Sequence, residues 1–176
     1  MGKRMEEAVE RHRVIQRKNL LGGGVEHIDR QHGRGKLTAR ERVECLVDPG
    51  TFSEFGTCVG TTSRRIDGRV PYAPCDGAVA GTGRVHGRLI IIHASDFTVL
   101  GGSIGAQHKM KFTGPLEMAA RWGIPMVNLL DSSGIGDGAA AVVLCPSSMA
   151  GEYQNGGVVH IKASTMATFL MCFSPA

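Results

Sequence analysis

Residues Arg88 to Gly136 read RLIIIHASDFTVLGGSIGAQHKMKFTGPLEMAARWGIPMVNLLDSSGIG. Leu89 to Ile92 is an unbroken aliphatic run, which is typical of a strand buried on both faces. Ala106 to Trp122 has helical spacing, and Gly123 after it is a natural helix stop. Met126 to Leu130 predicts a second buried strand. Strand, helix and strand in this order indicate a parallel βαβ-type unit.

Each predicted strand is followed by a loop that contains glycine. Gly101-Gly102-Ser103 breaks the chain after the first strand, and Asp131 to Gly136 follows the second. In a parallel unit these two loops should emerge on one side of the sheet. The helix between them is expected to bury a face formed by Met110, Pro115/Leu116, Ala119/Ala120 and Trp122.

Upstream of this unit, the sequence predicts a hairpin and one further strand. Ala78 to Val85 and Arg88 to His93 flank a turn at His86-Gly87, which favours antiparallel pairing. Thr51 to Thr62 is rich in Phe, Val and Thr, so a strand is expected there. Arg64 to Pro74 is polar and is expected to be a loop.

The first fifty residues are predicted to be helical. Met5 to Leu21 is amphipathic and ends at Gly22-Gly23-Gly24, which indicates a helix stop because no strand precedes it and no Gly-Lys-Ser/Thr follows. Val25 to Gln31 predicts a short second helix. Thr38-Ala39-Arg40-Glu41 is a capping box that starts a third helix.

The composition bounds the class of protein. The chain has 176 residues and 42% hydrophobic content, and this length and composition suit one domain with a hydrophobic core. Its net charge is +4. The excess charge lies in residues 1–44, with eleven Lys and Arg against seven Asp and Glu. A basic patch there could meet an anionic ligand such as a nucleotide phosphate, and a solvated helix surface is the alternative. No aromatic residue is interleaved with these cations, so no nucleic-acid binding is expected.

Other features exclude several kinds of site and location. No segment approaches the ~20 apolar residues that span a bilayer, and the N-terminus has no apolar signal region. Five cysteines without a C-x-x-C pair indicate a reduced protein of the cytoplasm or the mitochondrial matrix. Seven scattered histidines predict no metal site.

Four motifs, which agree in order and spacing, resemble one protein family. They are similar to the carboxyltransferase subunit of the biotin-dependent acyl-CoA carboxylases, the family of propionyl-CoA carboxylase β and the methylmalonyl-CoA carboxyltransferase large subunit. The similarity covers roughly Arg11 to Gly134 and only the N-terminal half of such a subunit. The motifs are GRGKLTARERVECLVDPGTFSEFG from Gly33, DGAVAGTGRVHGRL from Asp76, DFTVLGGSIGAQHKMKF from Asp96 and GIPMVNLLDSSG from Gly123.

The resemblance implies both a fold and a function. The fold would be α/β, an incomplete crotonase-like ββα spiral around a mostly parallel core, with a helical segment at 1–50 and the partial carboxyltransferase domain at 51–176. The chain would be the acyl-CoA-binding half of an enzyme that moves a carboxyl group between carboxybiotin and the α-carbon of a short acyl-CoA such as propionyl-CoA. Biotin would sit on a partner, a biotin carboxyl carrier or biotin carboxylase subunit. A homo- or hetero-oligomer is expected, because the family's active site lies between halves of different protomers.

The resemblance also implies the place of the site. The family's thioester enolate needs preorganised donors for its oxyanion, and backbone N–H groups of a glycine loop supply them. These donors are predicted at Ser133 and Gly134. In the family the basic segment near the capped helix borders the CoA site, and the Gly-Gly-Ser loop lies against the acyl-CoA channel. The predicted substrate-binding residues are Lys36, Arg40, Phe97, Gly101, Gly102 and Ser103.

Two other functions stay open. The family continues D-S-G-G-A-R-I-Q-E-G where this chain has Asp131 to Gly138, and its later glycine motif is absent here. These departures favour a non-catalytic, truncated or regulatory subunit of such a complex. A crotonase-type CoA hydratase or isomerase would need a carboxylate pair, for which Asp137 with Glu152 is the candidate. His108, after the Gly-Gly-Ser loop, is expected to have either a structural or a catalytic role.

Overall fold

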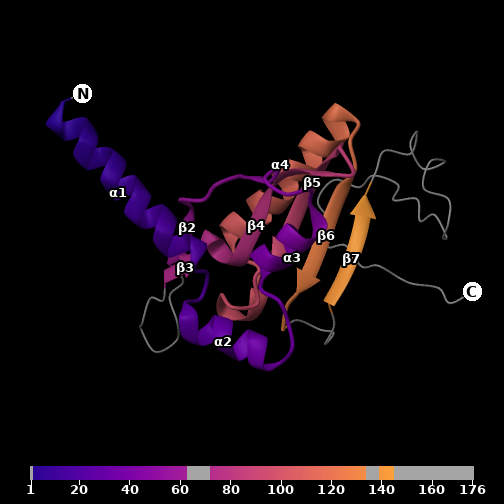
Figure 1. Cartoon of the computed structure of the whole chain (residues 1–176), viewed down its shortest axis with the longest axis horizontal. Helices are drawn as coiled ribbons and strands as arrows, with labels where there is room; N and C mark the ends of the chain where they lie inside the picture. The colour runs from indigo at the N-terminus through magenta and orange to yellow at the C-terminus, as the bar shows by residue number, and fades with distance from the viewer. Residues whose placement is uncertain (1, 63–71, 134–138, 145–176) are drawn as a thin grey trace, which may run out of the picture. The chain divides into compact units, whose positions relative to one another are not determined.

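The computed structural model of this chain describes residues 2–62, 72–133 and 139–144. All of them belong to the first of two units, Met1–Pro146 and Ser147–Ala176. The chain begins with three helices, α1 (Lys3–Leu20), α2 (Val25–Gly33) and α3 (Ala39–Leu46) (Figure 1). All three confirm predicted helices. The capping box at the start of α3 is present in both directions, between the Thr38 and Glu41 side chains and each other's backbone N–H groups.

The strands form one mixed sheet and one short ribbon. Five strands are hydrogen-bonded in the order β1-β4-β5-β6-β7, and β2 pairs with β3 separately. The β5–β6 pair is parallel, and the other pairs are antiparallel. The strands are β1 (Ser53–Glu54), β2 (Gly60–Thr62), β3 (Tyr72–Pro74), β4 (Ala78–Val85), β5 (Arg88–Ser95), β6 (Met126–Asp131) and β7 (Ala139–Leu144).

The predicted hairpin and βαβ unit are both present. β4 and β5 form the hairpin, and α4 (Ala106–Trp122) then carries the chain to β6. Gly123 ends α4 with a φ of 65°, a left-handed conformation that glycine adopts easily because it has no Cβ. β4, β5 and α4 together make one ββα unit.

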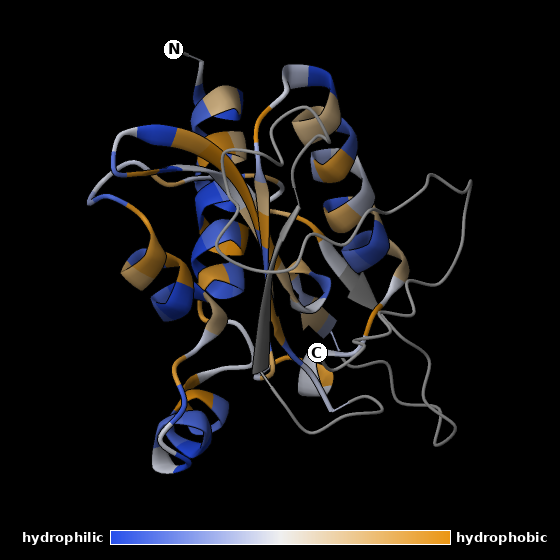
Figure 2. Cartoon of the chain, turned by 90° about the vertical axis from the view of Figure 1, so that its right-hand side faces the viewer, coloured by the Kyte–Doolittle hydropathy of each residue, from blue (hydrophilic) through white to orange (hydrophobic). Residues whose placement is uncertain are grey.

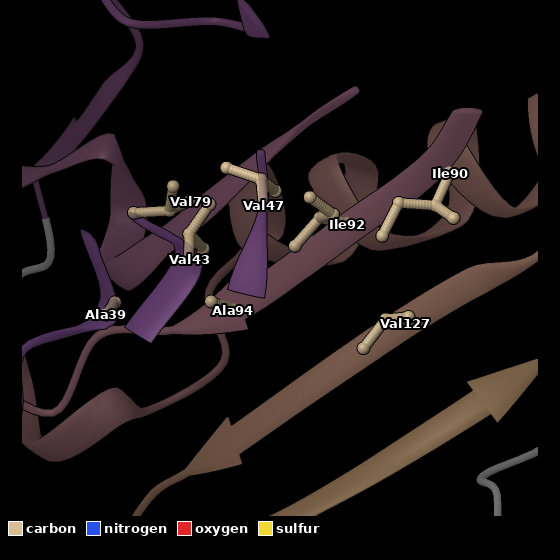
Figure 3. Packing of buried hydrophobic residues seen from close by; sticks show 8 residues of the cluster. All are labelled: Ala39, Val43, Val47, Val79, Ile90, Ile92, Ala94 and Val127. Carbon is tan, nitrogen blue, oxygen red and sulfur yellow. The ribbon is translucent and has the colours of Figure 1, made fainter. Parts of the chain in front are cut away.

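The core lies on both faces of β5. On one face, Val43 of α3 belongs to the same buried cluster as Ile90 and Ile92, and Figure 3 shows the whole cluster. On the other face, Ile91 packs with Ala119 of α4. Figure 1 accordingly shows α3 and α4 on opposite sides of the sheet, and Figure 2 shows apolar residues concentrated along the central strands. Burial on both faces confirms the prediction from the aliphatic run.

Three predictions about the strands are wrong. Arg64 to Pro74 is not a loop throughout, because Tyr72–Pro74 forms β3. Thr51 to Thr62 is not one strand, because the chain turns between β1 and β2, where the Val59 N–H donates to the Gly56 carbonyl over 3.1 Å. The core is also not mostly parallel, since β5–β6 is the one parallel pair among the described strands. The proposed division into residues 1–50 and 51–176 stays a prediction.

The predicted buried face of α4 is confirmed at Pro115 and Ala119 and wrong at Met110 and Trp122. Met110 is 63% exposed and Trp122 is 50% exposed. The buried residues of the helix instead include His108 and Lys111, together with Pro115 and Ala119. A pattern of apolar residues could not reveal this face, because two of its four buried members are polar.

Candidate functional site

The loops that follow β5 and β6 meet at one edge of the sheet. The Ser133 N–H donates to the Gly101 carbonyl over 2.8 Å, and the Ser133 hydroxyl donates to the same oxygen over 3.1 Å. A Cβ on Gly102 would lie 2.5 Å from the Asp131 carbonyl oxygen, so this contact requires glycine. The prediction that both loops emerge on one side is confirmed.

The loop after β5 is held by its own hydrogen bonds. Leu100, Gly101 and Gly102 have φ values of 49°, 65° and 71°. The Gly102 N–H donates to the Val99 carbonyl, and the Ser103 hydroxyl donates to the Leu100 carbonyl over 2.7 Å. These hydrogen bonds fix the conformation of the Gly101-Gly102-Ser103 loop.

Of the two predicted oxyanion donors, the structure describes Ser133, which lies at this edge. The N–H of Ser133 is occupied by the Gly101 carbonyl. Gly134 lies outside the described residues, as do Asp137 and Glu152 of the alternative carboxylate pair.

The N-terminal helices pack onto the same edge. The Gly23 N–H donates to the Thr98 hydroxyl over 3.0 Å. A Cβ on Gly23 would lie 1.8 Å from the Thr98 carbonyl oxygen, so any side chain there would force the two segments apart. The triple glycine therefore does more than end α1, because it lets α2 lie close to the loop after β5.

An open hollow of about 170 Å³ lies between α2 and this loop. Arg34 and Lys36 each place their charge 5.7 Å from the centre of the Phe97 ring, within cation–π range. The hollow is basic on its helical side and apolar or neutral on the loop side. Its lining residues are His27, Arg30, Gln31, Arg34, Phe97, Thr98 and Gly101.

The sequence predicts a basic patch within residues 1–44 but does not assign it to α2, although a signal for that helix was present. The lining residues at positions 27, 30, 31 and 34 follow the spacing i, i+3, i+4, i+7, which places them on one helical face. A search for periodic cations, in addition to periodic apolar residues, would have found this face.

Lys36 lies beside the hollow and pairs with the end of β6. Its ammonium donates to Asp131 Oδ1 over 3.2 Å, and the Gln31 amide donates to Asp131 Oδ2 over 2.7 Å. The side chain of Asp131 is 4% exposed, whereas that of Lys36 is 46% exposed. The buried carboxylate is therefore satisfied from the N-terminal segment, while the cation still faces solvent.

Arg40 belongs to a second, buried cluster. Its guanidinium forms an ion pair with Glu54, and their side chains are 20% and 7% exposed. The Lys111 ammonium lies 4.0 Å from Glu54 Oε1, which also accepts from Arg40, and it donates to the Ala78 carbonyl over 2.6 Å. Burial lowers the pKa of Lys111 and raises the pKa of the neighbouring Cys75 thiol. The structure thus brings Lys36, Phe97 and Gly101 together and directs Arg40 to Glu54.

Two buried histidines, His93 of β5 and His108 of α4, lie side by side. His93 Nδ1 lies 2.8 Å from the side-chain amide oxygen Oδ1 of Asn128, and its ring centre lies 5.1 Å from that of His108. Burial lowers the pKa of His93 to about 4 and also lowers the pKa of His108. The His108 N–H donates to the Asp76 carboxylate over 2.8 Å, which fixes the first turn of α4. The geometry of His108 is therefore that of a structural residue.

Within residues 2–62, 72–133 and 139–144, no three His, Cys, Asp or Glu side chains gather as metal ligands. In that same part of the chain, no helix is long and apolar enough to cross a membrane.

The model of the carboxyl transferase domain matches residues 30–164. The chain belongs to the carboxyl transferase domain family. The match begins at the end of α2 and includes both loops of the candidate site. It confirms the family predicted from the four motifs.

Curated relatives and solved structures agree with this assignment. The propionyl-CoA carboxylase beta chain of Roseobacter denitrificans is 44% identical over 114 residues, and the mitochondrial chain of Homo sapiens is 43% identical over 117. Each match covers 65% of this chain and 22% of the relative, so the chain spans about a fifth of their length.

The solved structure of transcarboxylase 12S, a hexamer with methylmalonyl-CoA bound, matches with a TM-score of 0.69 at 34% identity. That match covers 77% of this chain and 27% of the other. The beta subunit of geranyl-CoA carboxylase from P. aeruginosa matches with a TM-score of 0.59 at 28% identity, over 73% of this chain and 23% of the other. The crotonase-like ββα fold is thereby confirmed, and this chain covers part of it.

Proposed function

We propose that this chain is the acyl-CoA-binding part of a biotin-dependent carboxyltransferase. The observation that carries the proposal is the basic hollow beside a glycine loop, in a chain of the carboxyl transferase domain family. CoA has phosphates at one end and a thioester at the other, so it needs cations and a close backbone wall within one site.

The phosphates of CoA would meet Arg30, Arg34 and Lys36, and the thioester would lie against Gly101 and Gly102. A charge-assisted contact contributes roughly 1.5–3 kcal/mol when desolvated. The hollow is open, so each contact here should lie below that range and weaken with salt. The Phe97 ring, which contacts both Arg34 and Lys36, would form one side of the site.

The enolate oxygen would be held by backbone donors of the Ser133–Gly134 loop. Because the Ser133 N–H already donates to Gly101, we favour Gly134 as the donor. The buried His93, His108 and Lys111 are not assigned a catalytic role, because burial lowers their pKa values and they hold structural contacts.

Carboxybiotin on a partner carrier or biotin carboxylase subunit would supply the carboxyl group. A neutral ureido ring has no need of an arginine-lined hollow, so we assign that hollow to CoA and no described residue to biotin. The transcarboxylase 12S relative is a hexamer, and we propose that this chain also works in a homo- or hetero-oligomer. The cytoplasm or the mitochondrial matrix remains its predicted location.

One observation favours a second candidate, a non-catalytic assembly or regulatory subunit. The Ser133 N–H is engaged, and the residues that follow depart from the family's D-S-G-G-A-R pattern. Such a subunit would still bind CoA.

Calorimetric titration of the chain with CoA, propionyl-CoA and pantetheine tests the proposal. Both CoA compounds should bind, whereas pantetheine, which lacks the nucleotide phosphates, should bind far more weakly. Equal affinity for CoA and pantetheine, or no binding of CoA at millimolar concentration, would overturn it. Carboxyl transfer from a malonyl-type CoA to free biotin, measured with and without a biotinylated partner, separates the catalytic subunit from the regulatory one.

A further inference from the structure

The N-terminal helix α1 is held to the rest of the described chain through its C-terminal half. The Asn19 amide donates to the Thr57 and Val59 carbonyls over 2.9 and 3.0 Å, and the Tyr72 hydroxyl donates to Asn19 Oδ1 over 2.9 Å. Asn19 is accordingly the buried residue of this helix. Figure 1 shows the other end of α1 pointing away from the sheet and from α2 and α3.

The part of α1 that points away leaves apolar side chains in solvent. Met5 is 55% exposed and Ile15 is 44% exposed. From Lys3 to Glu10 every side chain is exposed except that of Val9, which is partly buried. A helix gains most of its stability from packing one face against other structure, so this part of α1 fits a partner outside the chain.

The charges of α1 are divided along its length. After the two cations of its first turn, the helix carries its three acids at Glu6, Glu7 and Glu10. Residues 11–18 then hold four cations and no acid. Two copies packed antiparallel would place the acids of each helix opposite the basic half of the other, whereas a parallel pair would place like charges together. The charge pattern therefore favours an antiparallel second copy of the same helix.

The ion pairs within α1 do not oppose this arrangement. Glu10 lies 3.8 Å from Arg13 and 2.7 Å from Arg17, and all three side chains are more than half exposed. Exposed pairs of this kind contribute little to stability, so these charges can exchange their partners for those of a neighbouring helix at small cost.

An anionic membrane is the other surface that a basic amphipathic helix could meet. The apolar side chains of α1 include neither Trp nor Phe, the residues that anchor such helices in lipid. Its three acids would also face the lipid phosphates. A second copy of the chain fits both features better.

We propose that α1 is an interaction surface for a second copy of this chain, with the two helices packed antiparallel about a two-fold axis. Each helix then covers the exposed Met5 of the other, and residues 6–10 of each face residues 11–18 of the other. This inference names a contact surface for the oligomer of the proposed function. It does not depend on CoA, because the hollow is lined by α2 and the loop after β5.

Sedimentation of the full chain over a concentration series at low salt tests the contact. We expect association that weakens as salt screens the paired charges. Met5→Gln should weaken it about tenfold or more, because a two-fold contact loses the apolar side chain twice. Met110→Gln on α4 is the matched control, since Met110 is 63% exposed, and it should leave association unchanged. A chain that stays monomeric, or equal association in the two variants, would overturn the inference.

Charge reversal tests the direction of the pair. Glu6→Lys with Glu7→Lys, and separately Arg13→Glu with Arg17→Glu, should each weaken association, because like charges then meet. The fourfold variant carries both changes and should recover association, since the acidic and basic halves are only exchanged. Circular dichroism of each variant checks that the helix is kept. If the fourfold variant keeps its helix and associates no better than the two double variants, the antiparallel pair is wrong.

Two further measurements separate this inference from other readings. Binding of the parent chain to phosphatidylglycerol vesicles, without association in solution, would assign α1 to a lipid surface and overturn the inference. CoA affinity should be the same in Met5→Gln as in the parent, because α1 does not line the hollow. Failure of the parent to bind CoA would overturn the proposed function and leave this contact standing.

Discussion

Two cationic side chains of one short segment, Lys36 and Arg40, lie in regions that differ in exposure. Lys36 lies beside the open hollow and is half exposed, although it pairs with a buried carboxylate. Arg40, four residues later, joins Glu54 and Lys111 in a buried cluster. A half-exposed cation can exchange its partner for a ligand at little cost, whereas a buried pair stabilises the fold and is costly to break. Lys36 and Arg40 carry the same charge, so it is their different exposure that makes Lys36 the candidate binding residue and Arg40 a structural one.

The largest effect is expected when the buried cluster is broken. Glu54→Gln leaves Arg40 and Lys111 without their counter-charge, which should lower the free energy of unfolding by about 3–5 kcal/mol. Urea denaturation measures this loss. Glu10→Gln is the matched control, because the ion pairs of Glu10 with Arg13 and Arg17 are exposed and should contribute about 0–1 kcal/mol. An equal loss of unfolding free energy in Glu54→Gln and Glu10→Gln would contradict the distinction between buried and exposed ion pairs.

Acid should also lower the free energy of unfolding, through the buried His93. The folded-state pKa of His93 is about 4, below its ordinary 6.5, so the unfolded chain takes up a proton that the folded chain resists. Stability should be full above pH 6.5 and fall by roughly 3 kcal/mol at most as the pH drops to 4. His108 contributes in the same direction. Denaturation of the parent and of His93→Gln across this range should show a shallower slope in the variant, and parallel slopes would contradict the account.

The contact between the triple glycine and the loop after β5 is expected to give the next largest effect. Gly23→Ala would place a Cβ against the Thr98 carbonyl and should cost about 1–3 kcal/mol, with weaker CoA binding because α2 moves away. Gly33→Ala, with nothing within 4 Å of its added Cβ, is the control and should be neutral or stabilising. Thermal melting and CoA titration of both variants measure this, and a stable, tightly binding Gly23→Ala would refute the close approach.

The smallest effect is expected at the half-exposed cation. Lys36→Ala should weaken CoA binding about two- to fivefold at low salt, and the loss should shrink as salt screens the charge. The free energy of unfolding should fall less than in Glu54→Gln, since the buried Asp131 carboxylate keeps its hydrogen bond from Gln31. Calorimetry at two salt concentrations is the measurement. Parent-like affinity at low salt would leave Lys36 as a solvated surface residue.

Local signals in the sequence predict much of this fold. Capping residues and glycines mark the ends of α1 to α4, and the aliphatic runs mark β5 and β6. The buried face of α4 could not be predicted, because His108 and Lys111 are buried through partners distant in the sequence. The same holds for the site. Lys36, Phe97 and Gly101 were predicted, but the pairing of Lys36 with Asp131 has no local signal.

The role of α2 in binding is tested most directly by removing both arginines from the hollow. Arg30→Ala with Arg34→Ala should weaken CoA and propionyl-CoA alike by about tenfold or more, as two partly exposed phosphate contacts are lost. Arg4→Ala with Arg11→Ala on α1 removes the same charge from exposed positions and should leave affinity nearly unchanged. Calorimetric titration of the two double variants is the measurement. A loss confined to the Arg30 and Arg34 variant is predicted, and equal affinities in the two would contradict a CoA site on α2.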